Sequence, residues 1–130
     1  MGSKGRPYRT TIVDGFEVLV GKGDAENDAL TFEVAAPGDF WLHVGGGVPG
    51  SHVVIRNPEN LAALPRPVVE HAATLAAWHS KARHGGRVEV HLCRVADVSK
   101  PRGAPPGEVQ LRRCRRVRVH AKDIPTAREP

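Results

Sequence analysis

The chain has 130 residues, of which 40% are hydrophobic and 25% are charged, and its formal net charge is +5. The length suits one compact domain, and the composition favours a folded domain over a disordered chain. Because there is no apolar run near the ~20 residues of a membrane span and no apolar signal-peptide core, we expect a cytoplasmic protein that has no membrane partner.

The positive charge is concentrated in the last third of the chain. Residues 1–80 carry six Lys and Arg against nine Asp and Glu, whereas residues 81–122 carry twelve against three. Such a basic segment favours a polyanionic partner, most simply nucleic acid, because cations that neutralise phosphates release counterions. A basic surface that only keeps the protein soluble is the alternative.

The first elements predicted are a β-hairpin and a short helix. Residues 8–13 and 16–20 are β-favouring runs separated by Asp14-Gly15, a two-residue turn signal, so they should form a hairpin. The segment 24–35 opens with acidic residues, which suit a helix N-terminus, although its later apolar residues alternate as in a strand. We predict a short helix there.

Two strands and the main helix should follow. The apolar runs 39–44 and 51–56 read as strands on either side of a glycine-rich loop. The segment 67–83 is the clearest helix, because Pro67 suits the first helical position and its last turn carries Lys81 and Arg83.

The C-terminal part reads as strands around a proline-rich loop. Residues 88–95 form a strand pattern, and 100–107 contain three Pro and two Gly and should be an irregular loop. Residues 109–111 and 115–120 are predicted to close the domain as a pair of strands. The fold class is therefore α+β: a single domain with a largely antiparallel sheet over residues 8–121, flanked by flexible tails at 1–7 and 122–130.

Alternation in the last of these strands sorts its side chains by type. Val117 and Val119 should face one side of the sheet, and Arg116, Arg118 and His120 the other, forming a basic ladder. The sequence therefore predicts a cationic face on the last strand.

The residues that could support catalysis or metal binding are few. The glycine loop lacks the Lys and the following helix of a phosphate-binding P-loop. Ser51 and His52 are neighbours on a strand, so they point to opposite faces and cannot share a proton. His43 and His52 are the best metal candidates, yet no ligand spacing is diagnostic, and we expect no metal, no cofactor and no catalytic residue.

Nucleic-acid binding is better supported by the residues present. Trp41, Trp78 and Tyr8 could stack on bases, with Trp78 more consistent with a core position, and the basic residues could contact phosphates. Single-stranded or looped RNA suits these parts better than a DNA duplex, since no helix is basic along one face. Cys93 and Cys114 lack metal spacing, so we expect two buried or half-buried free thiols.

Several blocks of the sequence resemble the NFACT-R family, the C-terminal RNA-binding module of proteins of ribosome-associated quality control, often labelled fibronectin-binding-like in bacteria. These blocks, in order, are Val20-Gly21-Lys22 with Glu26-Asn27-Asp28-Ala29-Leu30-Thr31, then Asp39-Phe40-Trp41-Leu42-His43, Pro49-Gly50-Ser51-His52-Val53-Val54-Ile55-Arg56, a block over 73–83, and one over 98–107. The resemblance covers nearly the whole chain. Departures are Gly23, where Asn is common, and 45–47, where charged residues are usual.

The resemblance implies a non-enzymatic module that binds RNA, such as tRNA or rRNA, with the ribosome or an RNA-modifying enzyme as a further partner. The chain looks like a stand-alone version of the module. The motif positions that the resemblance carries over as RNA-binding are Lys22, Asn27, Asp28, His43, Ser51, His52, Arg56, Lys81, Lys100 and Arg102. The charge pattern adds Arg83, Arg116 and Arg118.

Two other functions stay open from the sequence. One is a small hydrolase or modifying enzyme that uses His43 and His52 with Asp39. The other is a protein-interaction adaptor whose basic stretch meets acidic protein surfaces.

Overall fold

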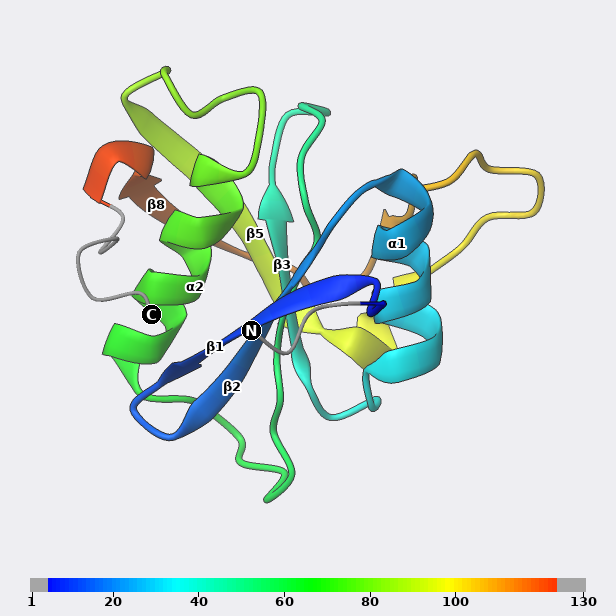
Figure 1. Cartoon of the computed structure of the whole chain (residues 1–130), viewed down its shortest axis with the longest axis horizontal. Helices are drawn as coiled ribbons and strands as arrows, with labels where there is room; N and C mark the ends of the chain where they lie inside the picture. The colour runs from blue at the N-terminus through cyan, green and yellow to red at the C-terminus, as the bar shows by residue number, and fades with distance from the viewer. Residues whose placement is uncertain (1–4, 124–130) are drawn as a thin grey trace.

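An antiparallel sheet of six strands runs through the middle of the molecule, between two helices (Figure 1). The structure is a computed structural model that describes residues 5–123. The six strands lie in the order β1-β2-β4-β3-β5-β8, and a small second sheet pairs β6 with β7. Their bounds are β1 Tyr8–Val13, β2 Phe16–Gly21, β3 Phe40–Val44, β4 Val53–Ile55, β5 Arg87–Arg94, β6 Val98–Ser99, β7 Gln110–Leu111 and β8 Arg115–His120. The predicted α+β class is confirmed.

The predicted first hairpin is present. Asp14 and Gly15 both have positive φ, 49° and 86°, so they form the type of two-residue turn whose twist matches the two strands. Val13 pairs with Phe16 directly beside this turn, and the ladder continues to Tyr8 and Gly21.

The segment after β2 is helical, as predicted. Helix α1 (Asp24–Ala29) continues into a π-helical turn, η1 (Leu30–Val34). Leu30, the first residue of η1, is fully buried in the core. Tertiary packing therefore favours the helix over the strand that the alternation also allowed.

Helix α2 (Arg66–Trp78) begins near the predicted residue but ends five residues before Arg83. The prediction of its end was wrong because the chain beyond Trp78 is bound by a distant segment. Gly50 and Ser80 form an antiparallel bridge, and the Lys81 N–H donates to the Pro49 carbonyl at 2.9 Å. These contacts hold residues 79–81 outside the helix.

The last two strands do not pair with one another, contrary to the prediction. β7 pairs with β6, whereas β8 pairs with β5 over six residues. Residues 112–114 separate the two, and Arg113 adopts positive φ at that corner. Strand β4 is also shorter than predicted, because the His52 N–H is bonded by the Asn27 side chain instead of a neighbouring strand.

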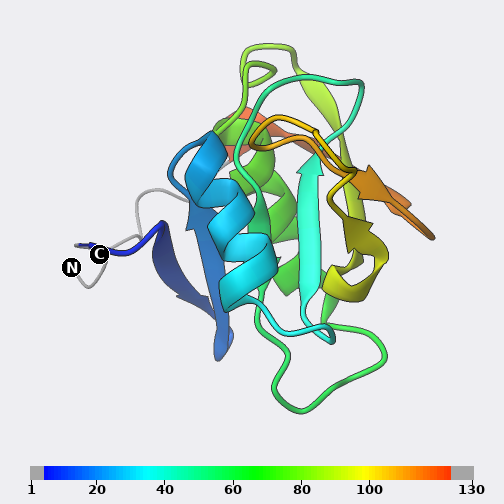
Figure 2. The ribbon, with the colours of Figure 1, turned by 90° about the vertical axis from the view of Figure 1, so that its right-hand side faces the viewer.

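Each helix covers one face of the main sheet. Valines of β2, β4, β5 and β8 pack against α2 in the larger hydrophobic cluster, while Leu19, Trp41 and Val54 pack against Leu30 on the opposite face. Seen from the side, α1 crosses the face that α2 does not cover (Figure 2). Neither α1 nor α2 is long and apolar enough to cross a membrane.

The predicted tails are described only in part. Residues 1–4 and 124–130 lie outside the described residues. Lys122, which the prediction assigned to the C-terminal tail, belongs to a single 3₁₀ turn, η3 (Ala121–Asp123), that follows β8.

Candidate nucleic-acid interface

The face of the sheet opposite α2 is covered over β2 and β4 and more open toward β8. Val117 and Val119 face the α2 side, so Arg116 and Arg118 lie on the opposite face, as predicted. Both arginines are exposed. Their register partners on β5 are His91 and Glu89, respectively. The predicted basic ladder therefore continues onto β5 as a mixed charged surface.

Glu89 connects the charged side chains of this surface. Its Oε2 atom lies 3.1 Å from Arg116 Nε and 3.4 Å from His91 Nε2. Sequence reasoning did not select either β5 residue, although their alternation with Val88, Val90 and Leu92 placed them on this face. A carboxylate among the cations lowers the positive potential here.

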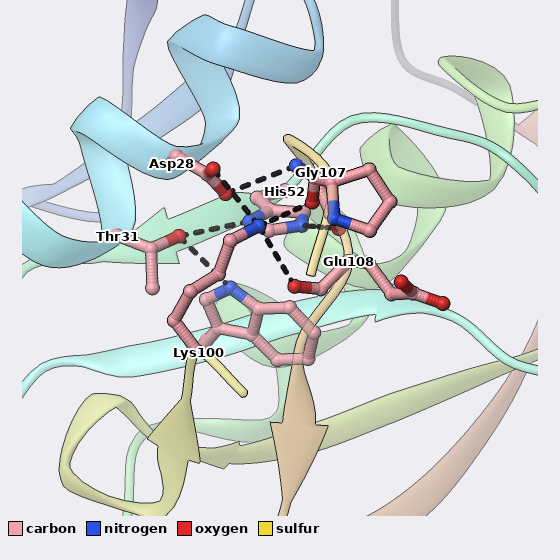
Figure 3. A network of polar contacts seen from close by, with 8 residues as sticks. Asp28, Thr31, His52, Lys100, Gly107 and Glu108 are labelled. Atoms are coloured by element: carbon pink, nitrogen blue, oxygen red, sulfur yellow. Dashed lines mark hydrogen bonds and ion pairs between the residues drawn. The ribbon is translucent and has the colours of Figure 1, made fainter. Parts of the chain in front are cut away.

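His52 lies at the centre of a buried polar network (Figure 3). Its Nε2 is 3.2 Å from the Gly107 carbonyl, which can only accept, so Nε2 carries the proton. Its Nδ1 therefore accepts from the Thr31 hydroxyl at 2.9 Å, and that oxygen accepts from Trp41 Nε1–H at 3.2 Å. Burial, and next the nearby His43, lower the pKa of His52 to about 4. His52 is thus a neutral structural group.

Lys100 and Asp28 hold the proline-rich loop 100–108 over this network (Figure 3). Lys100 Nζ lies 3.0 Å from Asp28 Oδ2 and also donates to the carbonyls of Pro105 and Glu108. Asp28 Oδ1 accepts the Gly107 N–H at 3.0 Å. All these contacts are internal to the protein, so both side chains are engaged in shaping the loop.

Asn27 and Ser51 fix the other loop of the site, the glycine-rich segment before β4. Asn27 is buried; its amide oxygen accepts the His52 N–H at 3.1 Å, and its amide nitrogen donates to the Gly50 carbonyl at 3.2 Å. The Ser51 hydroxyl donates to the Gly21 carbonyl at 2.8 Å. Gly21 packs so closely on Asn27 that a Cβ atom could not fit there.

Arg56 lies away from these loops and pairs with a buried carboxylate. Its Nε is 2.8 Å from Asp39 Oδ2. Asp39 also accepts backbone N–H groups of Ala36 and Asn57, so it organises the turns beside β3 and β4. Asp39 lies just before the start of β3 and His43 lies near its end, so the two side chains are not brought together by the fold.

His43 forms a cluster of three rings with Trp41 and His52 and faces a groove. Its ring stacks on Trp41 at 5.9 Å and meets His52 edge-on at 5.4 Å. Its Nδ1 donates to the Val44 carbonyl at 2.7 Å. Burial is the main cause that lowers the pKa of His43, so the ring is predominantly neutral at neutral pH.

Two grooves meet at the Pro49-Gly50 ridge. The first, which we call the loop groove, has a volume of about 540 Å³ and lies between residues 43–50 and 105–109. The second, the helix-end groove, has a volume of about 490 Å³ and contains Trp78, Lys81 and Arg83. Both views of the ribbon place the glycine-rich loop and the chain after α2 at one end of the molecule (Figures 1 and 2).

Several predicted cations are exposed around these grooves. Arg83 lies over the Trp78 ring at 5.2 Å, in the range of a cation–π contact. Lys22 is exposed beside the helix-end groove, next to Gly23, and Arg102 is exposed in the loop 100–108. The exposed members of the predicted set are Lys22, Lys81, Arg83, Arg102, Arg116 and Arg118.

The stacking role expected for Trp41 was wrong, because only 1% of this side chain is exposed. A base cannot stack on a ring that η1 and the β6–β7 region cover. Tyr8 packs partly against the same hydrophobic cluster, and Trp78 is half-buried at the wall of the helix-end groove. Of the three aromatic side chains, Trp78 has the ring that a ligand in a groove could contact.

The geometry gives little support to a hydrolytic site. The Ser51 hydroxyl proton is committed to a carbonyl, and both ring nitrogens of His52 are engaged. In residues 5–123 no three His, Cys, Asp or Glu side chains are grouped so that they could hold a metal ion. Cys93 is buried and Cys114 half-buried, both as free thiols, as predicted.

Comparison with known proteins identifies the family to which the chain is similar. Residues 6–113 match the family model described as the NFACT protein RNA binding domain. The curated proteins named Rqc2 homolog RqcH from Streptococcus suis and Bacillus subtilis are 42% and 44% identical to this chain over 115 and 102 residues. The matched regions make up 20% and 17% of those proteins, so the chain spans about a fifth of their length.

A solved structure has the same fold. The C-terminal part of the fibronectin/fibrinogen-binding protein from Streptococcus suis superposes with a TM-score of 0.84 and 37% identity. The match covers 96% of this chain and 49% of that one.

Proposed function

Since the chain belongs to the family of NFACT protein RNA-binding domains, we propose that it is a non-enzymatic module that binds tRNA through the exposed cations around the two grooves. The similarity to the RqcH proteins supports a ribosome quality-control setting in the cytoplasm as part of this proposal. Ribosomal RNA is the alternative ligand within the same proposal.

The proposal rests on the observation that the predicted RNA-binding residues fall into two groups, one engaged within the protein and one exposed. Asn27, Asp28, Ser51, His52 and Lys100 are engaged with backbone groups or with one another and shape the two loops. Lys81, Arg83 and Arg102 point their charge outward beside those loops, and Arg116 and Arg118 extend the cationic surface along β8. We therefore propose that the first group positions the surface and the second contacts phosphates.

The charge distribution supports a polyanion over a protein partner. Each exposed cation on this surface can neutralise a phosphate, and the released counterions supply affinity without reading the sequence. The ion pair of Arg116 with Glu89 on this surface is a weak, solvated contact. A phosphate can therefore replace it at little cost.

A titration of fluorescently labelled tRNA by anisotropy tests the proposal. For ~five phosphate contacts, the logarithm of the affinity should fall with the logarithm of the salt concentration with a slope of about −3 to −4. The folded protein, verified by circular dichroism, is measured at low and moderate salt. Absence of binding at low salt would overturn the proposal.

A further inference from the structure

The loop groove has the size and the walls of a site for one flat, neutral ring. We propose that it holds the base of a single unpaired nucleotide of the bound RNA, with the neighbouring phosphates held by the cations on either side. This inference rests on the proposed function and specifies the ligand: RNA that offers an unpaired nucleotide, not a continuous duplex.

The walls of the groove are built from rings. His43 and His91 contribute imidazole rings on the sheet side, and Pro105 and Pro106 contribute pyrrolidine rings on the loop side. The volume of about 540 Å³ falls within the ~300–1,000 Å³ of small-molecule sites. Flat aromatic and imidazole surfaces are what proteins use to stack unpaired bases.

The walls are held in place before any ligand arrives. His43 is fixed by its stacking on Trp41 and its hydrogen bond to the Val44 carbonyl. The His91 ring lies against Gly45 so closely that a Cβ atom there would meet Nε2 at 2.7 Å. On the opposite side, Gly107 is bonded through both its N–H and its carbonyl. A preformed site loses little conformational entropy when it binds.

The interior of the groove is unsuited to a phosphate. Its lining includes Asp24 and Glu108, which would repel an anion, and His43 is predominantly neutral because burial lowers its pKa. Of the backbone amides that line it, the Gly45 N–H is already bonded to the Glu89 carbonyl at 2.9 Å and is not offered to an anion. A neutral base therefore fits the groove better than the charged part of a nucleotide.

Cations lie on both sides of the groove, where phosphates of the same strand would pass. Across the Pro49-Gly50 ridge, Lys81 and Arg83 line the adjoining helix-end groove. On the β8 side, Arg116 is the register partner of His91. A base between these two cationic positions would place its 5′ and 3′ phosphates toward opposite sides. In a paired A-form helix the bases stack on one another and cannot enter such a groove.

The test uses two hairpin RNAs that differ at one position. In one, 2-aminopurine is bulged and unpaired; in the other it is paired with uracil. The bulged RNA should bind roughly 5- to 150-fold more tightly, because stacking of one base contributes about that factor. Its fluorescence should fall on binding, because the stacked base is quenched.

His91→Ala should remove both the preference and the quenching, while His91→Phe, which keeps a flat ring, should retain them. Arg66→Ala, at the far end of α2, is the matched control, and thermal melting checks that each variant is folded. Equal binding of the two RNAs, or preference without quenching, would overturn the inference while leaving RNA binding intact. Failure of the protein to bind either RNA would overturn the proposed function itself.

Discussion

His52 and Gly107, which are 55 residues apart in sequence, are joined by a hydrogen bond from the buried imidazole Nε2–H to the glycine carbonyl oxygen, 3.2 Å long. This bond links the residue just before β4, where the glycine-rich loop ends, to the proline-rich loop on the other side of the loop groove. It makes His52 a residue that shapes the interface instead of a catalytic base.

The network around His52 predicts a pH-dependent stability. The pKa of His52 falls to about 4 on folding, below its ordinary value of 6.5, so the unfolded chain binds the proton more tightly. Stability from this group is complete above pH 6.5 and is lost as the pH falls toward 4. Between pH 7.5 and pH 5 its share of the loss should be about 2 kcal/mol.

Urea unfolding of the wild type and of His52→Gln at both pH values measures this share. The variant removes the titrating group and keeps polar atoms at the site, so it should lose less stability on acidification than the wild type. Equal losses in the two proteins would show that His52 does not titrate as described.

Asn27 should be essential for stability. Asn27→Ala leaves the buried His52 N–H without its partner and removes the amide donor to the Gly50 carbonyl, and a buried group left unsatisfied costs about 1–3 kcal/mol. Guanidinium unfolding should therefore show a loss of more than about 2 kcal/mol. Glu26→Ala, on the exposed side of α1, is the control and should change little. A loss of stability no larger than in the control would contradict this role of the Asn27 hydrogen bonds.

Substitutions of Lys100 and of Arg102 should distinguish a cation that shapes a loop from a cation that contacts RNA. Lys100→Met should free the loop, so the Gly107 amide, now held by Asp28, should exchange with deuterium faster. Arg102→Met removes an exposed charge and should leave this exchange unchanged while lowering the magnitude of the salt slope for tRNA by about 0.7. NMR exchange and anisotropy measure the two effects. Faster exchange in Arg102→Met alone would reverse the assignment.

Removal of the carboxylate on the basic face should strengthen RNA binding. Glu89 pairs with Arg116 at 3.1 Å and lies opposite Arg118 in the strand register. Glu89→Gln frees these cations for phosphates, so tRNA affinity should rise several-fold at low salt and less at high salt. Glu17→Gln, on β2, is the control. Weaker tRNA binding by Glu89→Gln would place the RNA elsewhere.

Local signals in the sequence were sufficient where a structure depends on neighbouring residues. The Asp14-Gly15 turn, the start of α2 near Pro67 and the facing of Arg116 and Arg118 follow from dihedral preferences and strand alternation. These features need no knowledge of the rest of the fold.

The errors arose where distant segments compete for the same backbone. Lys81 and Arg83 read as a helix end, but residues 49–51 bind the backbone of 79–81 and stop α2 at Trp78. The same cause explains the error at Trp41. This residue was predicted to stack on bases, but in the fold Leu30 of the π-helical turn packs in the same buried cluster. His91 was missed because its role depends on the glycine-rich loop that packs against it.

In the proposed function, the exposed cations around the two grooves contact RNA and the buried motif residues do not. The most direct test is the salt dependence of tRNA binding by Arg116→Ala/Arg118→Ala, compared with the wild type and with Arg66→Ala. The double variant should keep its stability and lower the magnitude of the slope by about 1.4, whereas Arg66→Ala should match the wild type. A double variant with an unchanged slope and affinity would contradict the claim.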